Sequence, residues 1–146
     1  MAFRFSLDAV LRFRESLEHS EETALLLIVR QMVEAEQELQ QVEAEQARIR
    51  GQLEKDLACT LPAAHLIDIA QRELELKGTA DGLRVRLRQL EAQRLTQLAV
   101  YQAVRRDRQV LSELRERQRH AYQLEQKRQD QKTLDDMFLV RTRGRE

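Results

Sequence analysis

The fold is decided by residues 25–53, which read LLLIVRQMVEAEQELQQVEAEQARIRGQL. Apolar residues recur in this stretch at alternating spacings of three and four, with one polar residue among them. These positions are Leu25, Ile28, Met32, Ala35, Leu39, Val42, Gln46, Ile49 and Leu53. A seven-residue repeat of this kind is typical of a helix that packs along another helix as a coiled coil. We therefore expect a first helix over about residues 6–57, with Ser6 as its N-cap and Asp8 in its first turn.

A turn is expected at about residues 58–62, followed by a second helix. Pro62 is excluded from a helix interior but fits a first turn, so the second helix begins near it. Apolar spacing returns at Leu83 and continues to Phe138, which predicts a second helix over about 63–139. The apolar segment 63–70 is either the beginning of this helix or a separate capping helix.

The apolar spacing of the second helix is interrupted once. The step from Leu90 to Leu95 and Leu98 departs from the seven-residue repeat. Such a phase shift predicts local unwinding of the coiled coil.

Folding the chain at about residue 61 brings together positions whose numbers add to about 122. Leu39 then lies near Leu83, and Met32 near Leu90, so the two apolar rows coincide. The first helix ends opposite about Leu114, which leaves residues 117–146 to project alone. An isolated helix of that length is marginal in water. The expected fold is all-α: a single coiled-coil domain over 1–146, in which two long antiparallel helices form a hairpin and the second helix overhangs.

Charge favours the same arrangement. The chain carries 25 basic and 25 acidic residues, so its formal net charge is zero. Residues 1–57 hold 7 basic against 12 acidic side chains, whereas residues 105–146 hold 12 against 8. An acidic first arm and a basic last arm suit helices that lie side by side. Without an overall basic excess, nucleic acid is not expected as a partner.

The number of cysteines and the length of the uncharged runs indicate the cellular compartment. Cys59 is the only cysteine, so no disulfide within the chain is possible and a reducing compartment is expected. No signal peptide or transmembrane segment is recognisable, because the longest uncharged runs fall far short of the roughly 20 apolar residues of a membrane helix. We expect a cytoplasmic protein.

No pattern of residues indicates catalysis. The four glycines are isolated and form no phosphate-binding loop. His19, His65 and His120 stand far apart, so we expect no metal site, and no cofactor-binding motif is present. The adjacent Asp135 and Asp136 point in different directions on a helix, which does not suit paired carboxylate chemistry. We expect that the protein is not an enzyme and that it has no catalytic residues.

Three segments remain as candidates for binding. Residues 24–29 are apolar all around a helix, which indicates either a thicker core or an exposed partner patch. Residues 105–119 are rich in Arg and suit a solvated face that pairs with the acidic first arm. Residues 128–136 have nothing left in the chain to pair with. The third segment is therefore the strongest candidate for a partner contact.

Both ends of the chain resemble the FliJ family, the stalk protein of the bacterial flagellar type III export apparatus. The opening FRFSLDAVLRFRE at residues 3–15 is similar to the start of that family. The close is similar too, with Tyr122 followed by EQKRQDQKTLDD at residues 125–136. The family pattern falls there on Arg128, Asp130, Gln131, Lys132, Leu134, Asp135 and Asp136.

The resemblance implies a stalk similar to the γ subunit of rotary ATPases. Such a stalk inserts its paired termini into the export ATPase hexamer and stimulates it, and it also binds the export-gate membrane protein and substrate chaperones. The residues that match the ATPase contact are Phe5, Leu7, Leu11, Arg14, Arg128, Gln131, Lys132, Leu134 and Asp135. A weaker match to the gate contact falls on Ile69, Arg72, Leu76 and Thr79, of which Leu76 matches by position. The implied location is the cytoplasm, peripheral to the inner-membrane export apparatus.

Other functions fit the same helices. The equivalent stalk of a virulence type III secretion system shares this fold and role. An export chaperone would bind a secreted partner and leave the ATPase unaffected. A coiled-coil scaffold or homodimer is a further alternative, because Gln46 in the apolar row suits either a hairpin or a dimer.

Overall fold

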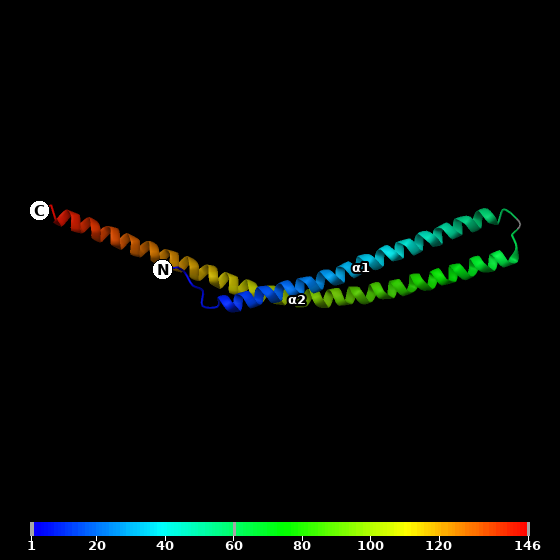
Figure 1. Ribbon diagram of the computed structural model, residues 1–146, viewed down its shortest axis with the longest axis horizontal. Helices are drawn as coiled ribbons and strands as arrows, with labels where there is room; N and C mark the ends of the chain where they lie inside the picture. Colours follow the sequence, from blue (N-terminus) through cyan, green and yellow to red (C-terminus); the bar gives the residue numbers. More distant parts are fainter. Residues whose placement is uncertain (1, 60, 146) are drawn as a thin grey trace. The chain divides into compact units, whose positions relative to one another are not determined.

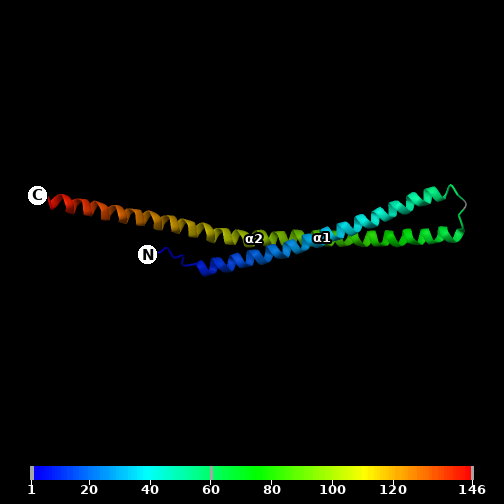
Figure 2. The ribbon, with the colours of Figure 1, turned by 45° about the horizontal axis from the view of Figure 1, so that its top comes forward.

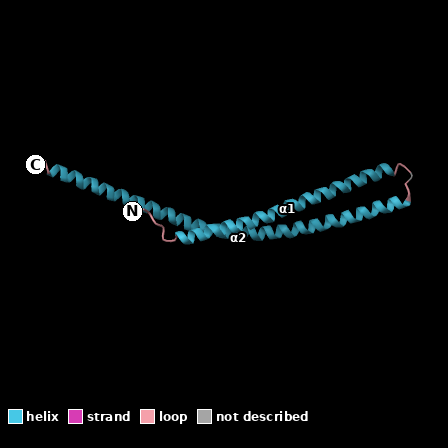
Figure 3. Ribbon diagram, in the orientation of Figure 1, coloured by secondary structure: helices cyan, strands magenta, loops and turns pink. Residues whose placement is uncertain are grey.

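The computed structural model describes residues 2–59 and 61–145, and nearly all of them lie in two helices (Figure 1). Helix α1 spans Asp8–Asp56 and helix α2 spans Ala63–Arg143, with 49 and 81 residues. These described residues contain no strand, and loop remains only at the ends and between the helices (Figure 3). The expected all-α fold, with two packed helices of which the second is longer, is confirmed.

The chain divides into two compact units, each of which contains a segment of both helices. The middle unit comprises residues 21–101, and the terminal unit comprises residues 1–20 and 102–146. In the middle unit, α1 and α2 lie side by side in both views (Figures 1 and 2). Arg72, early in α2, contacts Glu45, late in α1, whereas Gln97 contacts Glu21. The helices of this unit are therefore antiparallel.

Most buried and half-buried side chains of the middle unit follow the seven-residue repeat, and we call these positions the seam. On α1 they are Glu21, Leu25, Ile28, Met32, Ala35, Leu39, Val42, Gln46, Ile49, Leu53 and Asp56. On α2 they are Ile69, Glu73, Leu76, Ala80, Leu83, Leu87, Leu90, Arg94, Gln97 and Tyr101. The most completely buried are Ala35 and Ala80. The predicted row of α1 is thus its packed face.

The seam of α2 keeps its period where a phase shift was expected. Leu95 is 55% exposed, and the half-buried residues that follow Leu90 are Glu91, Arg94, Gln97 and Leu98. Of these, Arg94 and Gln97 lie at the positions that continue the seven-residue repeat. Both polar side chains have partners: Arg94 Nε donates to Glu91 Oε2 at 2.9 Å, and Gln97 Nε2 donates to the Glu21 carbonyl at 3.1 Å. Because their polar groups are satisfied, these residues can lie in the seam, so the burial pattern keeps the seven-residue repeat where a phase shift was expected.

The register agrees with a fold at about residue 61. In the middle unit, the numbers of contacting residues add to 117 for Arg72 with Glu45 and to 127 for Arg84 with Glu43. In the terminal unit, Arg14 with Asp107 gives 121. These values lie on both sides of the expected 122.

The helix ends differ slightly from expectation. Helix α1 begins at Asp8, and the Leu7 carbonyl accepts the Leu11 N–H at 2.9 Å, so the cap position belongs to Leu7 instead of Ser6. Pro62 directly precedes α2, and its carbonyl accepts the N–H of His65 at 3.1 Å. Because α2 is continuous from Ala63, the segment 63–70 is its beginning and not a separate capping helix.

The terminal unit packs the start of the chain against α2. Phe5 and Leu11 are buried, with 8% and 1% of their surface exposed. The Phe3 ring lies against the Tyr122 ring, with centroids 5.7 Å apart and planes inclined by 47°. The residues before α1 therefore cover part of α2 that was expected to project alone from residue 117. Exposure becomes continuous only at residues 127–145.

Candidate functional site

The exposed part of α2 from residue 127 to its end is the principal candidate site, and we call it the tail. Every described residue from 127 to 145 is exposed. The tail contains five of the residues that resemble the ATPase contact. They are Arg128, Gln131, Lys132, Leu134 and Asp135.

Polar contacts within the tail are short-range and weak. Gln131 Nε2 donates to Asp135 Oδ1 at 3.1 Å, one helical turn away. Arg128 Nη1 lies 3.9 Å from Glu125 Oε2, and both side chains are more than half exposed. Exposed pairs of this kind contribute about 0–1 kcal/mol, so a partner can replace them at little cost.

An apolar cluster in the tail was not recognised as a site from sequence. Met137, Phe138, Leu139 and Val140 follow one another along the helix, and each is more than half exposed. Three of them, Met137, Phe138 and Val140, border a shallow groove on the helix surface together with Leu134. Leu134 and Phe138 continue the apolar spacing of α2 into the tail, and both are exposed, at 62% and 68%. The sequence signal that could have identified this cluster is the run of four apolar residues between Asp136 and Arg141.

The N-terminal candidates have different environments. Phe5 and Leu11 are buried inside the terminal unit, whereas Leu7 is exposed. Arg14 Nη1 donates to Asp107 Oδ2 at 3.4 Å. The structure therefore assigns Phe5 and Leu11 to the packing of this unit, and Leu7 is the accessible apolar side chain among them.

The Arg-rich segment 105–119 pairs in part with α1, as expected. Arg108 forms two hydrogen bonds to Glu18, Nε to Oε2 at 2.6 Å and Nη2 to Oε1 at 3.2 Å. By contrast, Arg115 and Arg119 lie near Glu116 on their own helix, at 4.0 and 3.9 Å. Charge pairing across the terminal unit therefore centres on Arg108.

The residues that resemble the gate contact lie on two sides of α2. Leu76 is buried and Ile69 is half-buried, and both belong to the seam. Arg72 and Thr79 are exposed and lie seven residues apart. The expected set therefore does not form one exposed surface.

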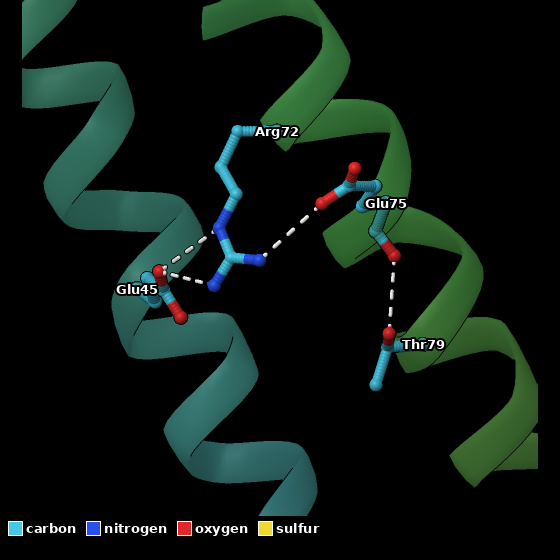
Figure 4. Close-up of polar contacts among 4 residues, drawn as sticks. All are labelled: Glu45, Arg72, Glu75 and Thr79. Atoms are coloured by element: carbon cyan, nitrogen blue, oxygen red, sulfur yellow. Dashed lines mark hydrogen bonds and ion pairs between the residues drawn. The ribbon is translucent and has the colours of Figure 1, made fainter.

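Figure 4 shows Arg72 reaching from α2 to Glu45 on α1. Its Nη2 lies 2.8 Å from Glu45 Oε1, and its Nη1 lies 3.4 Å from Glu75 Oε2. The hydrogen bond and charge of Glu45, followed by those of Glu75, raise the pKa of the Arg72 guanidinium. The Thr79 hydroxyl donates to the Glu75 carbonyl at 3.1 Å. Arg72 thus links the two helices on one side of the middle unit.

The apolar segment 24–29 is only partly covered. Leu25 and Ile28 are half-buried in the seam, but Leu26 and Leu27 are 60% and 55% exposed. A thicker core would have covered both of these side chains. The structure thus favours the alternative of an exposed apolar patch.

Two further properties concern metals and membranes. Within 2–59 and 61–145, no group of three His, Cys, Asp or Glu side chains is arranged to hold a metal ion. Neither helix, over its described residues, combines the length and apolarity that a membrane span requires.

Comparison with known proteins gives one match. The sequence profile of the family described as Flagellar FliJ protein matches residues 3–146. Neither a curated protein nor a solved structure matches the chain.

Proposed function

The chain belongs to the FliJ family, and we propose that it binds and stimulates the export ATPase hexamer as the stalk of the flagellar export apparatus. The family is a non-enzymatic component of this apparatus, which agrees with a molecule built from helix packing alone. The proposal concerns the finer role: which partner is bound, and through which surface.

The exposed tail is the observation that supports this role. Residues 127–143 are helical and exposed, whereas α1 and the N-terminal segment cover the preceding part of α2. A helix without intramolecular packing gains stability from a partner. Its exposed apolar side chains, including Leu134 and Phe138, give that partner surface to bury.

We divide the candidate ATPase-binding residues by their burial. Leu7, Arg128, Gln131, Lys132, Leu134 and Asp135 are the contact residues, together with the apolar cluster at 137–140. Phe5 and Leu11 hold the N-terminal segment on α2, and Arg14 supports them through Asp107. Mixed charges on the tail allow weak contacts with several subunits of a ring, because each exposed pair contributes about 0–1 kcal/mol.

Contacts with the export gate and with substrate chaperones are part of the same proposal. Of the gate candidates, Arg72 and Thr79 are accessible, and Leu76 and Ile69 support them from the seam. A gate contact at Arg72 would exchange its ion pair with Glu45 for one with the partner. We propose a cytoplasmic location, peripheral to the inner-membrane export apparatus.

The test is ATP hydrolysis by the cognate flagellar export ATPase, with and without an equimolar amount of this protein. We expect a higher rate and formation of the ATPase ring. The triple variant Gln131→Ala, Lys132→Ala and Leu134→Ala should lose the stimulation while its helicity is unchanged, because all three side chains are exposed.

A matched control replaces a similar set of exposed side chains in the middle unit. This variant combines Val85→Ala, Arg88→Ala and Gln89→Ala, and it should stimulate like the unmodified protein. Intact stimulation by the tail variant would remove the tail from the ATPase contact. No stimulation by the folded, unmodified protein would favour the chaperone or scaffold alternatives.

A further inference from the structure

Four of the five candidate ATPase-binding residues of the tail share one side of the helix. Successive residues of an α-helix are turned by about 100°, so residues three and four apart are neighbours on its surface. Arg128, Gln131, Lys132 and Asp135 follow one another at spacings of three, one and three. Gln131 Nε2 donates to Asp135 Oδ1 at 3.1 Å, which shows that these two side chains adjoin. We call this side of the tail the contact strip, and Leu134 lies beside it.

The apolar cluster at 137–140 divides between the contact strip and the opposite side of the helix. Phe138 and Leu139 lie three and four residues after Asp135, so they continue the strip. Met137 and Val140 lie about 170° and 130° around the helix from the middle of the strip. Exposure does not distinguish the two pairs, because Phe138 and Leu139 are 68% and 56% exposed and Met137 and Val140 are 60% and 72% exposed. Position around the helix distinguishes them.

The strip changes from polar to apolar toward the end of α2. Thr142 continues it, four residues after Phe138 and three after Leu139. The Thr142 hydroxyl donates to the Phe138 carbonyl at 3.1 Å and to the Leu139 carbonyl at 2.9 Å. Because this hydroxyl has acceptors within its own helix, it requires no polar group on a partner. The contact strip thus has a polar half at 128–135 and an apolar half at 138–142.

The two halves differ in what they can contribute to binding. Exposed polar pairs are weak, so the polar half can orient a partner but adds little affinity. Aromatic side chains dominate the energetics of protein interfaces, because each buries a large apolar area in a pocket of the partner. Phe138 is the one aromatic side chain of the strip. Its burial is therefore the largest gain that a contact on this side offers.

We infer that Phe138 and Leu139 are the apolar anchor of the ATPase contact, and that an apolar pocket of the ATPase receives them next to polar groups that face Gln131 and Lys132. Met137 and Val140 lie outside this contact. The inference rests on the proposed function and narrows it from the whole apolar cluster to one side of the tail.

Four single variants of the full-length protein test the division. Phe138→Ala and Leu139→Ala truncate the strip, and Met137→Ala and Val140→Ala are the matched controls. Helicity should be unchanged in all four, because each replaces an exposed side chain with the best helix former. The measurement is the concentration of this protein that stimulates the cognate flagellar export ATPase half-maximally. We expect Phe138→Ala to raise it about tenfold or more and Leu139→Ala about threefold, whereas each control should change it less than about twofold.

Salt tests the apolar character of the pocket. The loss in Phe138→Ala should be the same at low and high sodium chloride, because salt screens charges and not apolar burial. The loss in Lys132→Ala should shrink as salt rises. Phe138→Leu, which keeps an apolar side chain, should bind more tightly than Phe138→Gln. A loss in Phe138→Ala that shrinks in step with that in Lys132→Ala would overturn the apolar pocket.

Other outcomes overturn the division of the cluster and leave the proposed function standing. Equal losses in all four Ala variants would mean that the ATPase encloses the tail on all sides. Losses confined to Met137→Ala and Val140→Ala would move the contact to the groove that these residues border. No loss in any of the four, while the variant at 131, 132 and 134 is inactive, would end the contact before residue 137. Absence of stimulation by the unmodified protein would instead remove the proposed function, and the inference with it.

Discussion

Glu18 of α1 accepts two hydrogen bonds from the Arg108 guanidinium of α2, at 2.6 and 3.2 Å, within the terminal unit. Both side chains are mostly covered, with 16% and 26% of their surface exposed. Both also occupy positions of the seven-residue repeat that are apolar in most of the middle unit. A paired charge thus takes the place of apolar packing at this level, and it restricts which residues can stand opposite each other.

The first prediction concerns this pair. Arg108→Ala should lower the free energy of unfolding by about 1–3 kcal/mol, because it leaves the half-buried Glu18 carboxylate without its partner. Replacing both residues with Leu should be close to neutral or stabilising, since it removes both charges and adds apolar contact. Urea unfolding followed by helicity measures each change. A double replacement that costs as much as Arg108→Ala would contradict the account of the pair.

A second prediction concerns the apolar seam of the middle unit. Leu90→Ala should lower the free energy of unfolding by about 2–3 kcal/mol, because Leu90 is buried and its truncation leaves a cavity. The control Val85→Ala removes an exposed side chain and should cost less than about 0.5 kcal/mol. Thermal unfolding of both variants under one condition checks the difference. Equal costs would show that Leu90 does not belong to the core.

The aromatic contact of the terminal unit supports a third prediction. Phe3→Ala should speed amide exchange over residues 4–11, because the contact with Tyr122 holds this segment on α2. An aromatic pair adds about 0.5–1.5 kcal/mol beyond burial, so the local rates should rise several-fold. Phe13→Ala, which truncates an exposed aromatic on α1, is the control. Hydrogen exchange read by mass spectrometry would contradict the contact if both variants gave the same pattern.

The fourth prediction is a dependence on pH at Glu91. The hydrogen bond from Arg94 is the main cause that lowers the pKa of the Glu91 carboxyl below its usual value near 4.5. Because the folded pKa is lowered, the stabilisation is present above the unfolded pKa and is lost as pH falls through the folded pKa. Glu91→Gln should therefore lower the melting temperature slightly at pH 7, and the difference should vanish in acid. A difference that grows as the pH falls would contradict this sign.

Much of the architecture could be predicted from local sequence. The repeat from Leu25 to Leu53 identified the packed face of α1, because a spacing of three and four selects one face of a helix. Pro62 located the start of α2, since it lacks an N–H and tolerates only a helix beginning. The exposed tail was also expected, although its first residue was placed about ten positions too early.

The exposure of Leu26 and Leu95 and the packing of the terminal unit were not predictable in the same way. Leu95 was taken as a seam residue because it is apolar, yet Arg94 and Gln97 occupy the seam and Leu95 is exposed. Gln97 is accommodated by Glu21, which lies 76 positions away in the sequence. No local pattern reveals that partner, since it exists only once the two helices have met.

The sequence by itself determined the two helices, their antiparallel register and the fact that α1 is too short to pack against the tail. It could do so because helical period and helix-breaking residues act over a few positions. Tertiary structure alone decided which polar residues enter the seam, that the Phe3 ring lies against Tyr122, and that Leu26 and Leu95 stay exposed. The physical reason is that a polar group is admitted to a packed face only when another element satisfies it. That condition depends on distant residues, and it also determines which apolar side chains remain outside.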